Sequence, residues 1–138
     1  MAERWTPRLL ILDDDPSYGM ILTRIAERSG WAPQATTDVV AFQKAFDAAR
    51  PDGIVLDLRL GAGSGREQLR FLHDAGFEGG IVVMSGSDEQ VLAAERDFGR
   101  SLGLAMTGLI AKPAENEEIR AQLVALAEFC AGRAGKSG

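Results

Sequence analysis

The stretch Leu9-Leu10-Ile11-Leu12-Asp13-Asp14-Asp15 decides the fold, because a short apolar run ends abruptly in three aspartates. Consecutive apolar residues over strand length are typical of a strand that is buried on both faces, as in a parallel sheet. Pro16 follows directly and suits the first turn of a helix, for which Asp15 is a fitting N-cap. The sequence therefore predicts a buried strand that leads at once into a helix.

The same order of strand and helix recurs along the chain. Three further apolar runs of strand length end at polar residues: Ile54–Leu56 before Asp57, Ile81–Met84 before Ser85, and Gly108–Ala111 before Lys112. A weaker, more polar strand is expected at 31–36. Apolar residues at helical spacing lie between and after the strands: Tyr18, Leu22 and Ile25; Val39, Phe42 and Phe46, after the cap Asp38; Leu69 and Leu72; Val91, Ala94, Phe98 and Leu102; and Ile119, Leu123, Leu126 and Cys130. This alternation predicts a doubly wound (βα)5 three-layer α/β sandwich with a five-stranded parallel sheet.

Length and composition place the chain among ordinary globular domains. It has 138 residues, of which 46% are apolar and 25% charged, which fits one domain. We expect an N-terminal extension at 1–7, the domain at 8–131 and a flexible tail of small and polar residues at 132–138.

Charge and cysteine usage bound the environment of the protein. No apolar run approaches the ~18 residues of a membrane helix, and Leu9–Leu12 is too short for the core of a signal peptide. The single cysteine, Cys130, cannot form an internal disulfide. We therefore expect a cytoplasmic protein without membrane contact. The net charge of −5 and the lack of a Lys/Arg cluster argue against direct nucleic-acid binding.

Polar side chains stand where the predicted strands end. In an open parallel sheet the carboxyl ends of the strands meet at one edge, where ligands bind at the topological switch point. We therefore expect one shallow cleft that gathers three carboxylates, one hydroxyl and one ammonium, from Asp13, Asp14, Asp57, Ser85 and Lys112.

This set of groups favours phosphoryl chemistry. Carboxylates that lie close together repel each other, and a divalent cation relieves the repulsion. Oxygen-only ligands suit Mg²⁺. A cation and Lys112 beside a carboxylate can neutralise phosphoryl oxygens, and Ser85 can donate a hydrogen bond to them. Asp57 would be the nucleophile, because carboxylates can form acyl phosphates.

Asp13-Asp14, Asp57 after an apolar strand, Ser85-Gly86 and Lys112-Pro113 together resemble the receiver domain of two-component response regulators. The resemblance covers about residues 8–130. It implies a flavodoxin-like fold similar to that of chemotaxis regulators and a bacterial phosphoprotein, not an enzyme. A sensor histidine kinase or phosphotransfer protein would donate the phosphoryl group.

The resemblance also implies a role for each matching position. Asp57 would be the phosphoacceptor, Ser85 the switch hydroxyl and Lys112 the partner of the phosphoryl group. The resemblance assigns Mg²⁺ to Asp14, Asp57 and the backbone carbonyl of Arg59, with Asp13 acting through a metal-bound water.

Two further positions bear on the family pattern. Gly65 matches a glycine that family members keep after the acceptor loop. Leu109 departs from the pattern, because it stands where Tyr or Phe usually couples phosphorylation to the outer face.

Phosphorylation would shift the surface near the last strand, which then binds a downstream effector protein or domain, or a second copy in a homodimer.

Simpler interpretations exist for single features. The acidic run could only cap a helix, since acids favour helix N-termini. His73, the only histidine, is expected at the surface, and Cys130 in the core. The glycine-rich stretch Gly61–Gly65 lacks the ending of a P-loop and predicts a flexible loop.

Other functions fit parts of the pattern. A phosphohydrolase with an aspartyl-phosphate intermediate would carry an acid two residues after the nucleophile, where this chain has Arg59. A flavodoxin-type carrier would not place Asp13-Asp14-Asp15 beside a phosphate. A phosphorylation-independent binding module of the same fold remains an alternative. So does the receiver part of a larger cyclic-di-GMP phosphodiesterase-type regulator, which the stretches Arg100–Leu104 and Ala111–Pro113 resemble.

Overall fold

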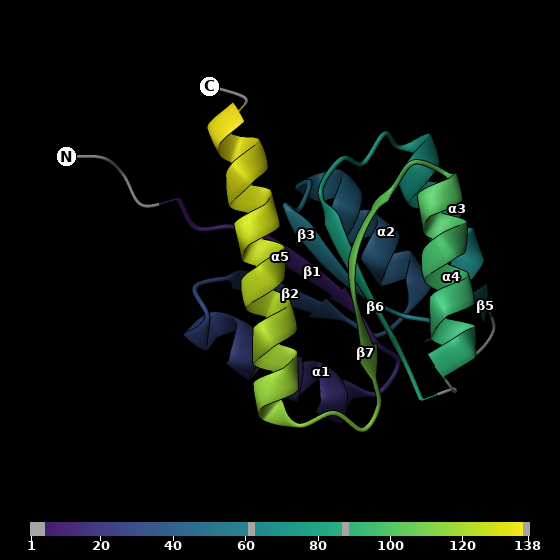
Figure 1. Cartoon of the computed structure of the whole chain (residues 1–138), viewed down its shortest axis with the longest axis horizontal. Coiled ribbons are helices and arrows are strands. Elements are labelled where there is room, and N and C mark those ends of the chain that lie inside the picture. Colours follow the sequence, from purple (N-terminus) through teal and green to yellow (C-terminus); the bar gives the residue numbers. More distant parts are fainter. Residues whose placement is uncertain (1–4, 61–62, 87–88, 137–138) are drawn as a thin grey trace.

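A computed structural model describes residues 5–60, 63–86 and 89–136 of the chain. Its main sheet has five parallel strands in the order β2-β1-β3-β6-β7 (Figure 1). The bounds are β1 Arg8–Leu12, α1 Pro16–Arg28, β2 Ala32–Thr36, α2 Val39–Ala48, β3 Gly53–Asp57, β4 Arg59–Leu60, β5 Gly63–Ser64, α3 Gly65–Asp74, β6 Gly80–Ser85, α4 Glu89–Ser101, β7 Ala105–Ala111 and α5 Asn116–Lys136. The predicted doubly wound sandwich is confirmed.

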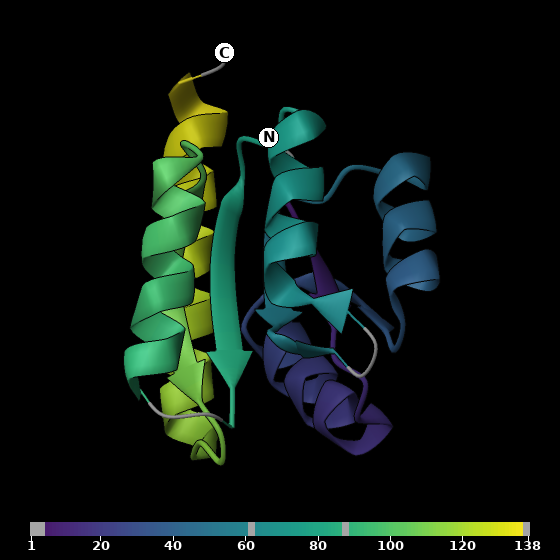
Figure 2. The same cartoon turned by 90° about the vertical axis from the view of Figure 1, so that its right-hand side faces the viewer.

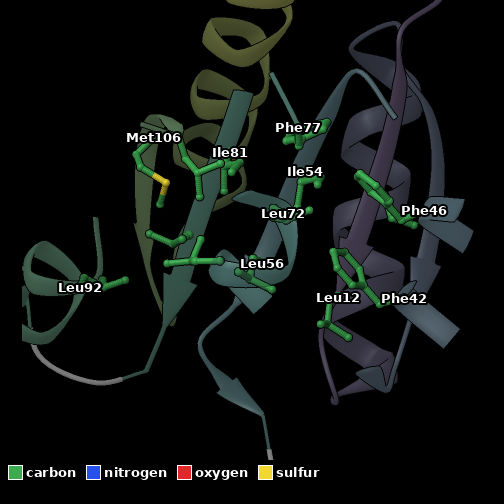
Figure 3. Packing of buried hydrophobic residues seen from close by; sticks show 14 residues of the cluster. Leu12, Phe42, Phe46, Ile54, Leu56, Leu72, Phe77, Ile81, Leu92 and Met106 are labelled. Carbon is green, nitrogen blue, oxygen red and sulfur yellow. The ribbon is translucent and has the colours of Figure 1, made fainter. Parts of the chain in front are cut away.

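Helices cover both faces of the sheet, because the inner strands are apolar on both sides. In β1, Leu10 and Leu12 pack in one core cluster with residues of α2, α3 and α4 (Figure 3). Leu9 and Ile11 alternate with them and pack on the other face with residues of α1 and α5. Alternate residues of a strand point to opposite faces, so a continuous apolar run builds two cores at once.

Local signals fix where the helices begin. The Asp15 carboxylate accepts a hydrogen bond from the Ser17 N–H at 2.9 Å and caps α1, and Asp38 accepts one from the Ala41 N–H at 2.8 Å and caps α2. Both predicted N-caps are confirmed. Each cap satisfies a backbone donor that the first turn of a helix leaves without an intrahelical partner.

The structure differs from the prediction in the last strand, which begins at Ala105 rather than Gly108. The register between β6 and β7 shifts between Ile81 and Val82, so Ile81 pairs with Met106 and Val82 with Gly108. The bulge places an extra residue, Thr107, in the strand and breaks the alternation of apolar residues there. The regular pattern that marks a strand in the sequence therefore starts only after the bulge.

Two segments expected to be flexible contain regular structure. Gly63–Ser64 pairs with Arg59–Leu60 in a two-stranded antiparallel ribbon, which lies at the same end of the molecule as the arrowhead of β6 (Figure 2). Positions 61 and 62, the start of the predicted glycine-rich loop, lie outside the described residues. Helix α5 continues to Lys136 and so extends into the stretch 132–138, for which a flexible tail was predicted.

None of the described helices is both long and apolar enough to span a bilayer.

Candidate functional site

Four neighbouring strands deliver polar residues to one edge of the sheet. Asp57 is the last residue of β3 and Ser85 the last of β6, while Asp13 and Lys112 directly follow β1 and β7. These strands lie side by side in the order β1-β3-β6-β7. The chain leaves β1 toward β2 on one side and returns to β3 on the other, so the aspartates flank the topological switch point.

Three carboxylates form the centre of the site. Asp13, Asp14 and Asp57 each offer an oxygen, and these oxygens all lie within 4.8 Å of one another. Asp13 and Asp57 are 1% and 2% exposed, whereas Asp14 is exposed to solvent. The cluster is therefore anchored in the protein on one side and open to an incoming ligand on the other.

The Lys112 ammonium bridges the two buried carboxylates. Its Nζ donates to Asp13 Oδ2 at 2.8 Å and to Asp57 Oδ2 at 3.1 Å, and its side chain is 18% exposed. Burial by itself lowers the pKa of Lys112, but the hydrogen bonds and the attraction of both carboxylates outweigh burial and raise it. Lys112 is therefore a fixed positive charge at neutral pH.

Backbone hydrogen bonds hold the site residues in place. The Asp13 carboxylate accepts a bond from the Asp15 N–H at 2.9 Å, and the Asp13 N–H donates to the Thr36 carbonyl at 3.1 Å. The Lys112 N–H donates to the Ser85 carbonyl at 2.9 Å, which ties the end of β7 to the end of β6. The backbones of Asp13 and Lys112 are thus fixed by hydrogen bonds to the ends of the neighbouring strands β2 and β6.

The remaining predicted positions lie around this centre. Ser85 is 1% exposed at the end of β6, and Arg59 opens the short strand β4, two residues after Asp57. Gly65 opens α3, and a Cβ there would lie 2.5 Å from Leu58 Cδ2 and 3.1 Å from Leu58 Cα. Only glycine lets α3 begin this close to the residue that follows Asp57.

Two residues to which the sequence assigned no part in the site lie as predicted, His73 at the surface and Cys130 in the core. His73 is exposed on α3, where its Nδ1 lies 3.1 Å from the neighbouring Asp74 carboxylate. Cys130 is buried in the core between α1, α5 and the sheet. Leu109 is partly buried and packs against the core on the α2–α3–α4 side. The predictions for His73 and Cys130 are confirmed.

Tyr18 belongs to the surroundings of the site, although the sequence indicated only a residue on the apolar face of a helix. Its ring centroid lies 4.4 Å from Lys112 Nζ, and its hydroxyl accepts a hydrogen bond from the Ala114 N–H at 3.4 Å. The signal in the sequence is its place in the first turn of the helix that follows Asp13-Asp14-Asp15.

The charges of the described site suit a divalent cation. Three carboxylates face one ammonium, so the cluster carries excess negative charge when all four groups are ionised. All the candidate ligands in the cluster are carboxylate oxygens, which Mg²⁺ and Ca²⁺ prefer over nitrogen or sulfur. The ammonium stands beside the cluster and can meet an anion that the cation attracts.

Comparison with known proteins gives consistent matches. The family model of the response regulator receiver domain matches residues 9–124. The photosynthetic apparatus regulatory protein RegA of Rhodovulum sulfidophilum is 32% identical over 123 residues, covering 88% of this chain and 64% of that protein. The acid tolerance regulatory protein ActR of Sinorhizobium medicae is 28% identical over 116 residues, covering 84% and 57%. The chain thus spans less than two thirds of the length of these relatives.

Solved structures share the architecture. A signal receiver domain from Vibrio parahaemolyticus superposes with a TM-score of 0.84 at 13% identity, covering 97% of this chain and 99% of that one, which is a likeness of fold. A response regulator protein from Burkholderia pseudomallei superposes with a TM-score of 0.71 at 27% identity, covering 96% and 75%.

Proposed function

This chain belongs to the response regulator receiver domain family of two-component systems, and from that premise we propose that it takes a phosphoryl group onto Asp57 from a histidine kinase or a phosphotransfer protein. The observation that carries the proposal is the bridge from the Lys112 ammonium to the Asp13 and Asp57 carboxylates. It places a fixed positive charge beside the carboxylate that would attack.

A related structure supports the choice of chemistry. The response regulator from Burkholderia pseudomallei was crystallised with a phosphorylated aspartic acid and a calcium ion. In the present chain Asp57 ends a central strand of the same fold, and Asp13 and Asp14 stand within reach of it. An acidic cluster that can hold a cation, with an ammonium at its side, can neutralise the charge of a phosphoryl group on Asp57.

The transfer is a direct displacement at phosphorus. A carboxylate oxygen of Asp57 forms the new O–P bond while the P–N bond of the phosphohistidine donor breaks, and the histidine leaves with the electron pair and takes up a proton. Lys112 is within hydrogen-bond distance of Asp57 and would neutralise part of the negative charge of the phosphoryl oxygens. The Ser85 hydroxyl is proposed as a second donor to these oxygens.

Mg²⁺ is the proposed cofactor. Asp13, Asp14, Asp57 and the backbone carbonyl of Arg59 would hold it, with waters completing the shell. When bound, the cation would neutralise phosphoryl oxygens together with Lys112. Asp14 is exposed to solvent, so a hydrated ion can approach the cluster from that side.

Intact-protein mass spectrometry after incubation with acetyl phosphate tests the proposal. We expect the mass of one phosphoryl group on the wild type in Mg²⁺, none on Asp57→Ala, and none when Mg²⁺ is replaced by EDTA. Asp74→Ala is the matched control, because Asp74 is exposed at the far end of α3 and should leave the modification intact. A wild type without added mass, or equal labelling of Asp57→Ala, would overturn the assignment.

The phosphorylated form would act by binding a partner. We propose a downstream effector protein or domain, or a second copy of the chain, as the occupant of the surface altered by phosphorylation. The relatives support a regulatory role, since RegA and ActR are named regulatory proteins. Size-exclusion chromatography with light scattering measures the molar mass of the purified chain before and after phosphorylation. A doubled mass after phosphorylation would indicate a second copy as the partner, and an unchanged mass would favour another protein.

A further inference from the structure

We propose that Tyr18 is a positioning residue for the phosphorylation reaction, and that its ring holds the Lys112 ammonium at the edge of the acidic cluster. The inference deepens the proposed function and rests on it, because it assigns to Tyr18 a part in the transfer to Asp57. It also makes a structural claim, a cation–ring contact, that can be tested without phosphorylation.

Tyr18 reaches the lysine from a different element. It lies in the first turn of α1, whereas Lys112 follows β7, and the Lys112 Nζ sits 4.4 Å from the centroid of the Tyr18 ring. A cation within about 6 Å of an aromatic centroid is attracted by the negative face of the ring. Lys112 is only 18% exposed, so water screens this attraction weakly.

The hydroxyl of Tyr18 contacts the same loop. It accepts a hydrogen bond from the Ala114 N–H at 3.4 Å, two residues beyond Lys112. The ring packs against the core between α1, α5 and the sheet, and this packing restricts its position. One side chain thus contacts the ammonium with its ring and the backbone that carries the lysine with its hydroxyl.

The ring differs from the other partners of Lys112 in one respect that matters for the reaction. Asp13 and Asp57 hold the ammonium in the described structure, but both also belong to the carboxylate cluster that suits a cation, and Asp57 is the proposed acceptor. During the reaction both carboxylates would also contact the cation, and Asp57 would also receive the phosphoryl group, so neither would hold the ammonium alone. The Tyr18 ring is uncharged and lies outside the carboxylate cluster, so it can keep the ammonium in place while the carboxylates change partners.

Two variants separate the contributions of the ring and the hydroxyl of Tyr18. Tyr18→Phe keeps the ring and loses the hydroxyl, and Tyr18→Leu loses both while it still fills apolar space. Tyr18→Met replaces Tyr18→Leu where that variant does not fold. Ile25→Ala is the matched control, because Ile25 also lies on α1 and packs against the same core.

The first measurement detects the contact in metal-free protein. The chain has only three lysines, and Lys44 on α2 is exposed and serves as an internal reference. A ring above Lys112 shifts the NMR signals of its ε-methylene upfield of those of Lys44. We expect this shift in the wild type, Tyr18→Phe and Ile25→Ala, and its loss in Tyr18→Leu. An unshifted Lys112 signal in the wild type would overturn the contact.

The second measurement is the rate of phosphorylation by acetyl phosphate in Mg²⁺. We expect Tyr18→Leu to react roughly three- to tenfold more slowly, the range that a partly desolvated cation–ring contact supplies. Tyr18→Phe should recover the wild-type rate, and Ile25→Ala should keep it. Equal rates for Tyr18→Leu and Tyr18→Phe would refute the positioning role. A wild type that takes up no phosphoryl group but shows the shifted Lys112 signal would instead refute the proposed function and leave the contact standing.

Discussion

Replacing Lys112 with methionine tests the electrostatics of the site most directly. Methionine has a similar length but no charge, so Lys112→Met removes the ammonium and leaves the carboxylates of Asp13 and Asp57, which are almost fully buried, without their cation. In metal-free buffer we expect a lower free energy of unfolding, because the two negative charges then repel each other in a poorly hydrated place.

The structure sets the size of the effect. Removing one partner of a buried ion pair typically costs about 3–5 kcal/mol. The cost here is lower, because the Lys112 side chain is 18% exposed and Asp13 keeps its hydrogen bond from the Asp15 N–H. We therefore expect about 2–3 kcal/mol, which corresponds to a fall of about 7–10 °C in the midpoint of thermal unfolding for a chain of this length.

The assay is thermal and urea unfolding followed by circular dichroism in EDTA. Lys44→Met is the control, because Lys44 is exposed on α2 and should change stability by less than about 0.5 kcal/mol. Adding Asp13→Asn to Lys112→Met should restore part of the lost stability, since it removes one of the repelling charges. A Lys112→Met protein as stable as the wild type, or no recovery with Asp13→Asn, would refute the reasoning.

The pH dependence follows from the same contact. The pKa of Lys112 is raised above its usual value of 10.5 by its bonds to Asp13 and Asp57, against the opposing effect of burial. The stabilisation by the ammonium is therefore complete below pH 10.5 and is lost as the pH rises through the higher value of the folded state. Unfolding of Lys112→Met should lack this alkaline loss.

Three further changes probe other parts of the structure. Asp14→Asn should weaken Mg²⁺ binding at least about tenfold in calorimetry, with no loss of metal-free stability, because Asp14 is exposed among like charges. Gly65→Ala should lower the free energy of unfolding by about 1–3 kcal/mol in urea titrations, because its Cβ would collide with Leu58. Burial raises the pKa of the Cys130 thiol above 9.0, so a thiol reagent at pH 8 should label the native protein far more slowly than the urea-unfolded chain.

The central part of the fold could be predicted from the sequence because strong local signals agree with the tertiary structure. The apolar runs at Leu9–Leu12, Ile54–Leu56 and Ile81–Met84 are all buried strands, and the caps Asp15 and Asp38 start helices as expected. Where a strand is buried on both faces, its composition leaves little choice of structure. Gathering of polar groups at one edge then follows from the parallel topology alone.

The features that the sequence did not predict depend on contacts between distant residues. The ribbon of Arg59–Leu60 with Gly63–Ser64 is too short to show a periodicity, and its glycines favour a loop in any pattern analysis. The start of β7 at Ala105 is hidden by the bulge at Thr107. The contact of Tyr18 with Lys112 joins α1 to the end of β7, and no local pattern carries that information.

The end of β7 is tied to the site through Lys112, although Leu109 stands in place of the aromatic residue usual in the family. The Leu109 side chain packs against the α2–α3–α4 core. Because leucine has no ring, the rotamer change of an aromatic side chain is absent at this position. The Lys112 N–H bonds the Ser85 carbonyl, and the Lys112 side chain bonds Asp13 and Asp57. A pull on Ser85 or Lys112 by a new phosphoryl group would therefore act on the backbone of β7 directly. We infer that the output is carried by strand displacement, and unchanged amide hydrogen exchange in β7 after phosphorylation would contradict it.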